Sequence, residues 1–426
     1  MKKLLFILIS CLLLSAQSIY SQQTKGIIGQ NNWLNNWTNF KPATEEYPEA
    51  TTILTGKIDK NLTLHKKQTY RLIGVVYVTN NAVLTIEPGT VIRGDVETCG
   101  TLVITKGAKI MAEGKDTDPI IFTSDKEAYA RKPGDWGGII ILGDAPINKI
   151  GGVSFLDFNL DHMISQYGGQ NPDSDSGILK YVRIEFSGRK LNTLKELNGL
   201  SLAGVGRQSK FSFIQISYSN DDSFECYGGD VNFDNLISFR ATDDDFDFTQ
   251  GAQCNINNSI AIRYPYSSDI SGSRCFEIDS FDKIENLDPT KKLTKITATN
   301  ITLANLEENN QGLVREAIYI KDKSYFSLSN SVVSGFKLCV LLDDKIANIS
   351  ANLAKINLQS LLVNNCEGGV QSEIIENDPE IKNWYSNESF SIEYSKLTKE
   401  ALFLQPNNKR IPDFRLKTNT ILVKGY

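Results

Sequence analysis

The sequence is poor in the side chains that build most zinc and nucleophile sites. Its 426 residues include two histidines, His65 and His162, and its cysteines show no CxxC spacing. Structural zinc sites draw on clustered Cys and His ligands, and Ser-His-Asp catalysis needs a histidine base. The sequence therefore argues against histidine-based zinc sites and against Ser-His-Asp chemistry.

An excess of charge of one sign is also lacking. The chain has 45 Lys and Arg against 50 Asp and Glu, a net charge of -5, and no basic cluster. Nucleic-acid-binding domains normally carry a basic patch, so we expect no nucleic-acid partner. The composition, with 41% apolar and 22% charged residues, is that of an ordinary folded protein.

Only the N-terminus carries a long apolar run. The stretch MKKLLFILISCLLLSAQSIYSQQ combines two lysines, an apolar segment and small polar residues, the pattern of a secretory signal peptide. We expect residues 1–21 to be that signal peptide, and the mature chain to be exported to the periplasm, the outer-membrane surface or the extracellular space. No later run approaches the roughly 18 to 20 apolar residues of a membrane span, so no transmembrane segment is predicted.

The mature chain keeps six cysteines: Cys99, Cys226, Cys254, Cys275, Cys339 and Cys366. An exported protein can oxidise its cysteines to disulfides. The coil spacing inferred below favours a Cys254–Cys275 pair, and buried free thiols are the equal alternative.

Short repeats organise the rest of the chain. LTIEPGTVI, which begins at Leu84, returns as LVITKGAKI at Leu102, a spacing of 102 − 84 = 18 residues. Further β-branched runs of alternating pattern follow, without helical periodicity. Hairpins would require Asn-Gly or Asp-Gly turns, and the chain has one such dipeptide, Asn198–Gly199. Even spacing without hairpins indicates a solenoid of parallel strands.

We therefore predict an all-β protein, a single right-handed parallel β-helix over residues 51–426. A solenoid needs a cap over its first coil. Residues 22–50 are the predicted N-terminal cap segment, in which Trp33, Trp37 and Phe40 would cover that coil. The alternative is that these aromatics line a sugar site.

Carboxylates recur at the same position of successive predicted coils. The motif DDSFE at 221–225 precedes DDDFD at 243–247 by 243 − 221 = 22 residues, and the pair Phe276–Glu277 repeats the step. Strand alternation, with the phenylalanines facing the core, sends a set of acids outward: Asp221, Glu225, Asp243, Asp245, Asp247, Glu277 and Asp279. Asp222 and Asp244 are expected to point inward and accept hydrogen bonds from turn amides.

Carboxylates on adjacent coils, about 4.8 Å apart, repel by roughly 3 kcal/mol at an effective dielectric constant of about 20. Hard oxygen ligands suit calcium, so these outward acids are the predicted metal ligands and calcium the candidate cofactor. One alternative is a solvated acidic rim balanced by Arg240 and Arg263. Another is catalysis by Asp245, Asp247, Arg240 and Arg263, either as paired carboxylates on a glycosidic bond or as a lyase with an arginine base.

Several longer blocks carry a family resemblance: GTLVITKGAKIMAEG, GDWGGIIILGDAPIN, SGILKYVRIEFSG, ISYSNDDSFECYGG and FRATDDDFDF. With them the chain resembles exported right-handed parallel β-helix proteins of Bacteroidota, often found near TonB-dependent uptake systems. The resemblance implies the fold, export and peripheral association with the outer membrane, and no assigned reaction. Unlike polygalacturonase-like hydrolases, the chain lacks a Gly-His-Gly element.

Three functions remain open from the sequence. The first is an exported cell-envelope or surface protein that binds a glycan or an envelope protein, with calcium on the acidic residues. The second is a polysaccharide lyase or glycoside hydrolase acting on an acidic polysaccharide. The third is a purely structural envelope protein. Binding predicts affinity without turnover, and the enzyme predicts product formation.

Overall fold

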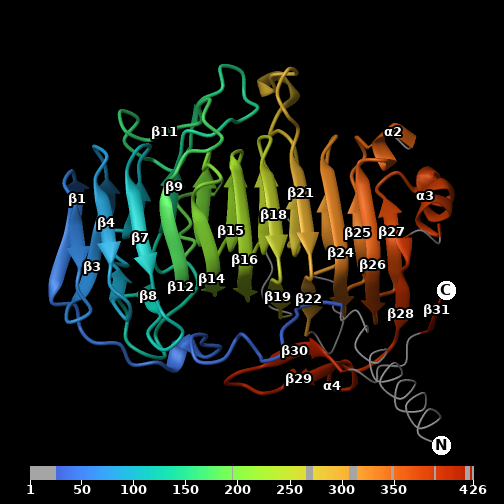
Figure 1. Ribbon diagram of the computed structural model, residues 1–426, viewed down its shortest axis with the longest axis horizontal. Coiled ribbons are helices and arrows are strands. Elements are labelled where there is room, and N and C mark those ends of the chain that lie inside the picture. Colours follow the sequence, from blue (N-terminus) through green and yellow to red (C-terminus); the bar gives the residue numbers. More distant parts are fainter. Residues whose placement is uncertain are drawn as a thin grey trace, which may run out of the picture.

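The computed structural model describes residues 25–193, 195–264, 272–306, 314–346, 350–387, 390–417 and 423–424. They form a right-handed parallel β-helix in which every full coil contributes strands to three sheets (Figure 1). The predicted fold class is thus confirmed. The predicted signal peptide, residues 1–21, lies outside the described residues.

The three sheets follow one another around each coil. Sheet 1 contains β2 (Leu62–Leu64), β4 (Val83–Ile86), β7 (Lys109–Glu113), β18 (Gln253–Asn257), β21 (Lys295–Thr299) and the first halves of five long strands. The long strands are β12 (Gly177–Glu185), β14 (Lys210–Ser217), β16 (Asp230–Phe239), β24 (Tyr325–Ser334) and β26 (Ile356–Asn364).

Sheet 2 takes the second halves of those strands together with β1 (Thr52–Ile58), β3 (Thr69–Val78), β5 (Val91–Gly94), β8 (Ile120–Ser124), β19 (Ile260–Arg263), β22 (Thr302–Asn305) and β28 (Glu393–Ser395). Sheet 3 contains the ends of β1 and β3, then β6 (Thr101–Ile104), β9 (Gly138–Leu142), β13 (Leu200–Ala203), β15 (Phe224–Tyr227), β17 (Phe246–Thr249), β20 (Phe276–Ile278), β23 (Glu316–Ile320), β25 (Leu338–Leu342) and β27 (Gly368–Ser372).

Single residues in the left-handed region make the corner between sheets 1 and 2. Tyr181, Phe213, Asn235 and Asn258 occupy this corner in successive coils, with φ values of 50°, 52°, 57° and 48°. Asn adopts this conformation more readily than most residues, which suits its recurrence here. One residue thus bends each long strand from sheet 1 into sheet 2.

Aromatic ladders fix the register of the coils in the core. The rings of Phe224 and Phe246 stack at 5.4 Å between centroids, and those of Phe246 and Phe276 at 5.0 Å. All three are buried, as predicted. This register aligns Glu225 with Asp247, and Asp247 with Glu277.

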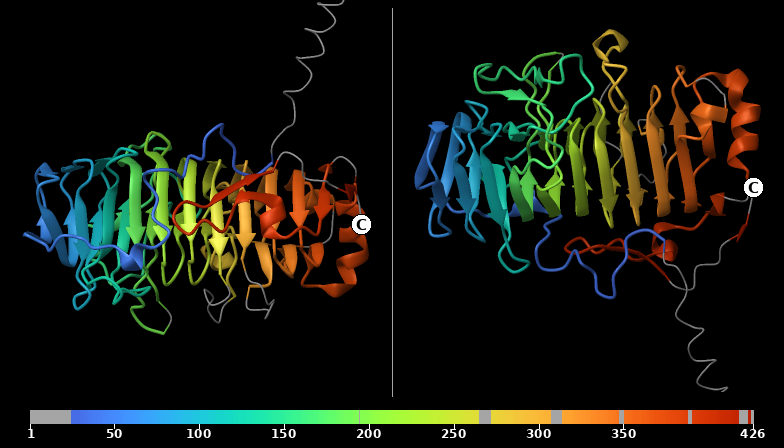
Figure 2. Two further views of the ribbon diagram at one scale, coloured as in Figure 1. Left: turned by 90° about the horizontal axis from the view of Figure 1, so that it is seen from below. Right: turned by 45° about the horizontal axis from the view of Figure 1, so that its top comes forward.

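The N-terminal segment does not cap the first coil. Residues 25–50 run along the outer face of sheet 2 instead (Figure 2). The Trp37 ring packs against Tyr181 at 5.8 Å and Phe213 at 6.0 Å, and Phe40 packs against Phe239 at 5.0 Å. The predicted cap position is therefore wrong.

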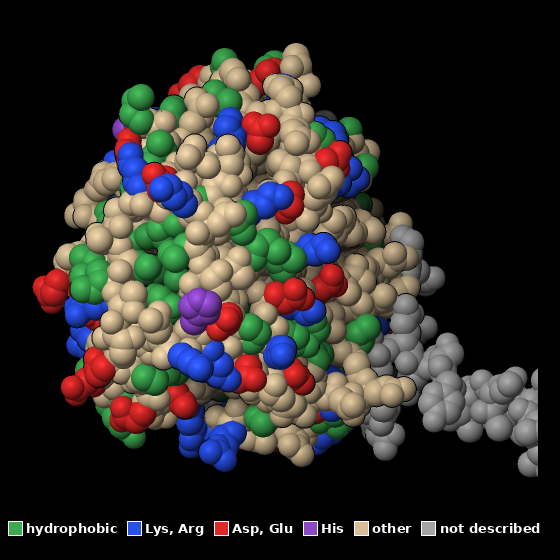
Figure 3. Space-filling model, turned by 60° about the vertical axis from the view of Figure 1, so that its left-hand side comes forward, with side chains coloured by type: hydrophobic (Ala, Val, Ile, Leu, Met, Phe, Trp, Pro, Cys, Tyr) green, Lys and Arg blue, Asp and Glu red, His purple; other side chains and the backbone are tan. Residues whose placement is uncertain are grey.

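The physical reason is an apolar outer face on sheet 2. Its strands turn buried apolar side chains away from the solenoid interior: Ile237, Phe239, Ile260, Ile262, Ala304, Val332 and Leu362. Covering this face removes these apolar side chains from water. At the first coil, Ile53 stays 60% exposed, and apolar side chains are visible among charged ones in Figure 3.

The C-terminal residues also leave the coils. The helix α3 (Asp378–Tyr385) covers the last coil, and a hairpin of β29 (Phe403–Gln405) and β30 (Asp413–Leu416) lies beside the N-terminal segment over sheet 2 (Figures 1 and 2). The Arg415 Nη1 donates to the carbonyls of Gly29 at 2.9 Å and Gln30 at 2.8 Å. The two ends of the described chain are thus tied together.

Several short helices and strands lie outside the parallel strands of the three sheets. An insertion between β9 and β12 carries the hairpin of β10 (Ser154–Phe155) and β11 (Gln166–Tyr167), and packs on sheet 3. The remainder are η2 (Pro42–Thr44), η3 (Ile284–Asn286), α2 (Ser350–Leu353), η4 (Ile375–Asn377), α4 (Lys399–Leu402) and β31 (Val423–Lys424). Among the described residues, no helix has the length and apolarity to cross a membrane.

The six cysteines in the described part of the chain are free thiols, so the favoured Cys254–Cys275 disulfide is absent and the free-thiol alternative holds. Cys99 is partly exposed and the other five are buried. The thiol of Cys226 lies within hydrogen-bonding reach of Cys254, because both point into the core from neighbouring sheets.

Removing the Trp37 side chain tests how far the N-terminal segment supports the solenoid. Trp37 is fully buried against sheet 2, so we expect Trp37→Ala to lower the free energy of unfolding by about 3–5 kcal/mol. Tyr129→Ala, at a side chain 79% exposed, should change it by less than about 0.5 kcal/mol. Denaturant titration followed by circular dichroism measures both, and equal midpoints would show that the segment is dispensable for stability.

Candidate metal centre

The acidic residues lie on sheet 3, where β15, β17 and β20 run side by side. The label of β15 marks this region near the middle of the solenoid in Figure 1. Glu225, Asp247 and Glu277 occupy the same register position on the three strands, as the repeat predicts. The next residue in this row is Tyr319 on β23. Adjacent coils are about 4.8 Å apart, so these carboxylates cannot avoid one another.

Three overlapping groups of carboxylates have oxygens within 4.8 Å of one another: Asp221, Asp222 and Asp243; Asp222, Glu225 and Asp247; Asp244, Asp247 and Glu277. We call the second group the central triplet. It shares Asp222 with the first group and Asp247 with the third, so the acids form one continuous cluster.

Basic side chains neutralise one end of this cluster. Glu277 accepts hydrogen bonds from Lys321 and from Arg274 Nη1, the latter at 3.1 Å. The Arg274 Nε also donates to Glu316 at 2.9 Å. The basic side chains of Lys321 and Arg274 therefore already neutralise charge in the third group.

The central triplet has neutral donors instead. Glu225 accepts hydrogen bonds from the Asn198 amide and the Tyr227 hydroxyl. Asp247 Oδ1 is buried, and no group among the described residues donates a hydrogen bond to it. A buried carboxylate oxygen without a donor is costly, so this position favours a bound cation or a proton.

The pKa values of the cluster follow from this environment. Burial and then the neighbouring acids raise the pKa of Asp222 and Asp247 well above the usual range. Burial likewise raises the pKa of Glu225 to about 8 and that of Asp279 to about 6. The metal-free cluster therefore retains protons at neutral pH, and a cation that binds there must displace them.

Asp245 contradicts the prediction that it faces outward. It is fully buried, and its Oδ2 accepts a hydrogen bond from Arg263 Nη1 at 2.9 Å. Residues 243–245 turn the corner before β17 begins at Phe246, so strand alternation does not apply to them. Arg263, equally buried, is the partner of Asp245 and does not balance a solvated rim.

Arg240, which was expected to balance the acidic residues, stacks on aromatic rings instead. Its guanidinium lies 3.7 Å from the ring centroid of Tyr264 and 5.5 Å from that of Tyr218, at the corner between sheets 2 and 3.

Asp279 accepts a hydrogen bond from Thr249 and stands outside the three carboxylate groups. The other predicted ligands, Asp221, Glu225, Asp243, Asp247 and Glu277, do come together.

Asp222 and Asp244 accept hydrogen bonds from turn amides, as predicted, but they do not point away from the other acids. Asp222 Oδ1 accepts a hydrogen bond from the Asp244 amide at 2.9 Å, and Asp244 Oδ1 accepts one from the Arg274 amide. The sequence did not indicate that both also belong to the carboxylate groups. It also gave no signal for Tyr227, which follows Glu225 on β15, or for Asn198 and Lys321, which reach the cluster from neighbouring coils.

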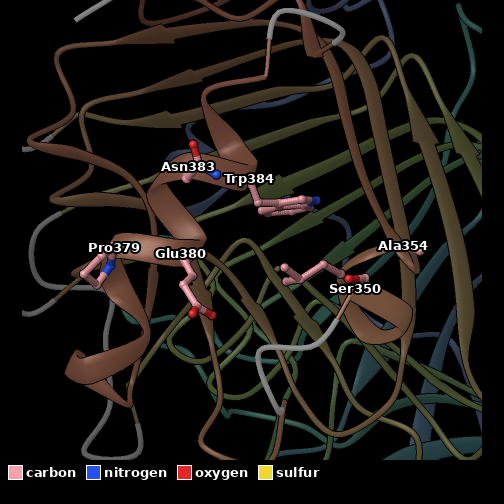
Figure 4. Close-up of a pocket in the computed structure, with 7 residues that line it drawn as sticks. Ser350, Ala354, Pro379, Glu380, Asn383 and Trp384 are labelled. Atoms are coloured by element: carbon pink, nitrogen blue, oxygen red, sulfur yellow. The ribbon is translucent and has the colours of Figure 1, made fainter.

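Two hollows of the described chain lie away from the acids. One, of about 530 Å³, opens between α2 and α3 at the C-terminal end and is lined by Leu353, Glu380 and Trp384 among others (Figure 4). Another, of about 370 Å³, lies between the N-terminal segment and the β29–β30 hairpin. The cluster itself is a row of carboxylates on sheet 3.

Comparison with known families agrees with the coil architecture. A family model described as a pectate-lyase-like β-helix domain matches residues 56–400. The chain belongs to the pectate-lyase-like β-helix family. Searches among curated proteins and among solved structures found no match.

Membership in the pectate-lyase-like β-helix family covers every coil that carries the acidic cluster. It confirms the coarse resemblance, that of a parallel β-helix protein. A shared fold does not assign a reaction, and the origin in Bacteroidota and the link to TonB-dependent uptake stay predictions.

The raised pKa values in this member of the pectate-lyase-like β-helix family predict how its stability depends on pH. Burial in the folded protein raises the pKa of Glu225 from 4.5 to about 8 and that of Asp279 from 3.8 to about 6. Between these values the folded protein holds protons that the unfolded chain releases, so stability falls as pH rises. We expect a lower melting temperature at pH 8 than at pH 5 in chelator, measured by differential scanning calorimetry.

Asp247→Asn is the variant that assigns this effect to the cluster. Asp247 raises the pKa of Asp222, so its neutralisation should weaken the pH dependence. The exposed Asp116→Asn is the matched control and should leave the dependence unchanged. A melting temperature that rises between pH 5 and pH 8 would contradict this account of the cluster.

Proposed function

We propose that the protein binds calcium at the central triplet of Asp222, Glu225 and Asp247, and with it an acidic glycan of the cell envelope. The observation that carries this proposal is the buried Asp247 Oδ1, which receives no hydrogen bond from the described residues and lies among carboxylates that outnumber the nearby bases. A divalent cation would reduce the repulsion between the carboxylates, and it would also coordinate the Asp247 oxygen.

The ligand atoms favour calcium over softer metals. The three groups contain only carboxylates, with no His or Cys among them. Calcium prefers six to eight hard oxygen ligands, whereas zinc and copper favour imidazole and thiolate. Three carboxylates leave coordination positions open, which water or the carboxylate of a ligand would fill.

The position of the site favours a linear ligand. The row of Glu225, Asp247 and Glu277 follows the solenoid axis, and Lys321 and Arg274 stand at one end of it. An acidic polysaccharide along this row would meet a bound cation first and fixed positive charges next. The pectate-lyase-like domain supports a polysaccharide as partner, and the N-terminal apolar run supports export to the envelope.

The bases around the cluster favour binding over lyase chemistry. Arg263 is buried in its ion pair with Asp245, and Arg240 is stacked on Tyr264. Carboxylate neighbours raise the pKa of Lys321 and of Arg274, although burial lowers both, so neither gives up its proton readily at neutral pH. A lyase needs a base that accepts a proton from the sugar ring.

A glycoside hydrolase is the second candidate. Glu225, whose pKa is about 8, would be a protonated acid at neutral pH among other carboxylates. Retaining and inverting glycosidases use such a pair, one acid to protonate the leaving oxygen and one carboxylate opposite it. Product formation separates this candidate from binding.

Calorimetric titration of calcium into the metal-free protein tests the proposal. Saturable binding is expected, and Asp247→Asn should raise the dissociation constant at least tenfold because it removes one charge and one ligand. Asp116→Asn, an exposed acid on another coil, should bind calcium as the parent protein does. Absence of calcium binding by the parent protein would contradict the proposal.

Polygalacturonate and alginate serve as acidic glycan probes in the same experiment. Retention on immobilised probe in calcium, lost in chelator and in the Asp247→Asn variant, is the expected result. Assays for unsaturated ends and for reducing ends should stay at background. Turnover that Glu225→Gln abolishes would favour the hydrolase, and retention that is equal in chelator would separate glycan binding from the cation.

A further inference from the structure

Behind the carboxylate cluster runs a buried chain of polar side chains. Ser223 and Ser238 share a hydrogen bond of 2.7 Å between their hydroxyl oxygens, and Ser238 also donates to Asp245 Oδ1. Asp245 Oδ2 then accepts from Arg263 Nη1 at 2.9 Å. All four side chains are fully buried.

The Arg263 guanidinium continues this chain into the backbone. Its Nη1 donates to the Arg274 carbonyl at 2.9 Å, and its Nη2 donates to the Asp243 carbonyl at 2.7 Å and to the Ala241 carbonyl at 3.4 Å. A planar guanidinium with several fixed donors can hold several acceptors in one geometry, which a lysine amine cannot do equally well.

The backbone segments that this chain joins are those that carry the acids. Ser223 lies between Asp222 and Glu225, and residues 241–245 lead directly into Asp247. Arg274 lies three residues before Glu277. One buried network therefore connects the three coils from which the cluster is assembled.

A buried ion pair is a weak source of stability, because desolvation offsets most of the attraction between its charges. The acids in front repel one another and tend to spread the turns apart. We propose that Arg263 and Asp245 are positioning residues, which hold the three turns at the spacing that the cation site requires. This inference rests on the calcium site proposed above, and it gives the pair a role other than ligand or base.

The experiment compares calcium affinity with thermal stability in Arg263→Met. The matched control is Arg93→Met, because Arg93 is also a buried arginine that donates to backbone carbonyls, those of Pro48, Asp125 and Lys126. Arg93 lies on β5, in coils that carry none of the clustered acids. Calorimetric calcium titration is carried out on both full-length variants at a temperature well below their melting temperatures.

We expect both variants to lose melting temperature, and only Arg263→Met to lose calcium affinity, by at least tenfold. The near-isosteric Asp245→Asn covers the case in which Arg263→Met fails to fold, and it should weaken calcium binding several-fold. Equal calcium affinity in the parent protein, Asp245→Asn and any folded Arg263→Met would overturn the positioning role. Absence of binding by the parent protein would refute the calcium site itself, which is a separate outcome.

Discussion

The parallel register of the coils is the constraint on which the structure depends. Backbone hydrogen bonds and the stacked rings of Phe224, Phe246 and Phe276 place equivalent residues of successive coils directly beside one another. An acid repeated at one position becomes a row of carboxylates about 4.8 Å apart, whatever their mutual repulsion. The acidic cluster is thus a product of the core, whose apolar burial outweighs the repulsion at the surface.

Repetition made the fold and the row of acids predictable. The alternation around Phe224, Phe246 and Phe276 gives both the buried rings and the alignment of Glu225, Asp247 and Glu277. A spacing of one coil is a local property of the sequence, so it can be read without a structure.

Features that depend on the corners or on distant contacts could not be read in this way. Asp245 lies where the chain turns, so alternation assigned it to the wrong side. Asn198 and Lys321 reach the cluster from coils whose sequence has no acidic motif. The cover over sheet 2 was missed because its apolar outer residues resemble a core strand in the sequence, whichever way they point.

The N-terminal segment and the C-terminal hairpin over sheet 2 change how the coils of the solenoid depend on one another. A plain solenoid resembles a one-dimensional array in which each coil feels only its neighbours and either end can fray alone. Here the N-terminal segment touches coils from β5, where Arg93 donates to Pro48, to β28, where Lys25 pairs with Glu393, and Arg415 ties it to the C-terminal hairpin. Coils that are far apart along the axis therefore contact the same covering segments. This favours cooperative unfolding of the whole solenoid over stepwise unfolding from one end.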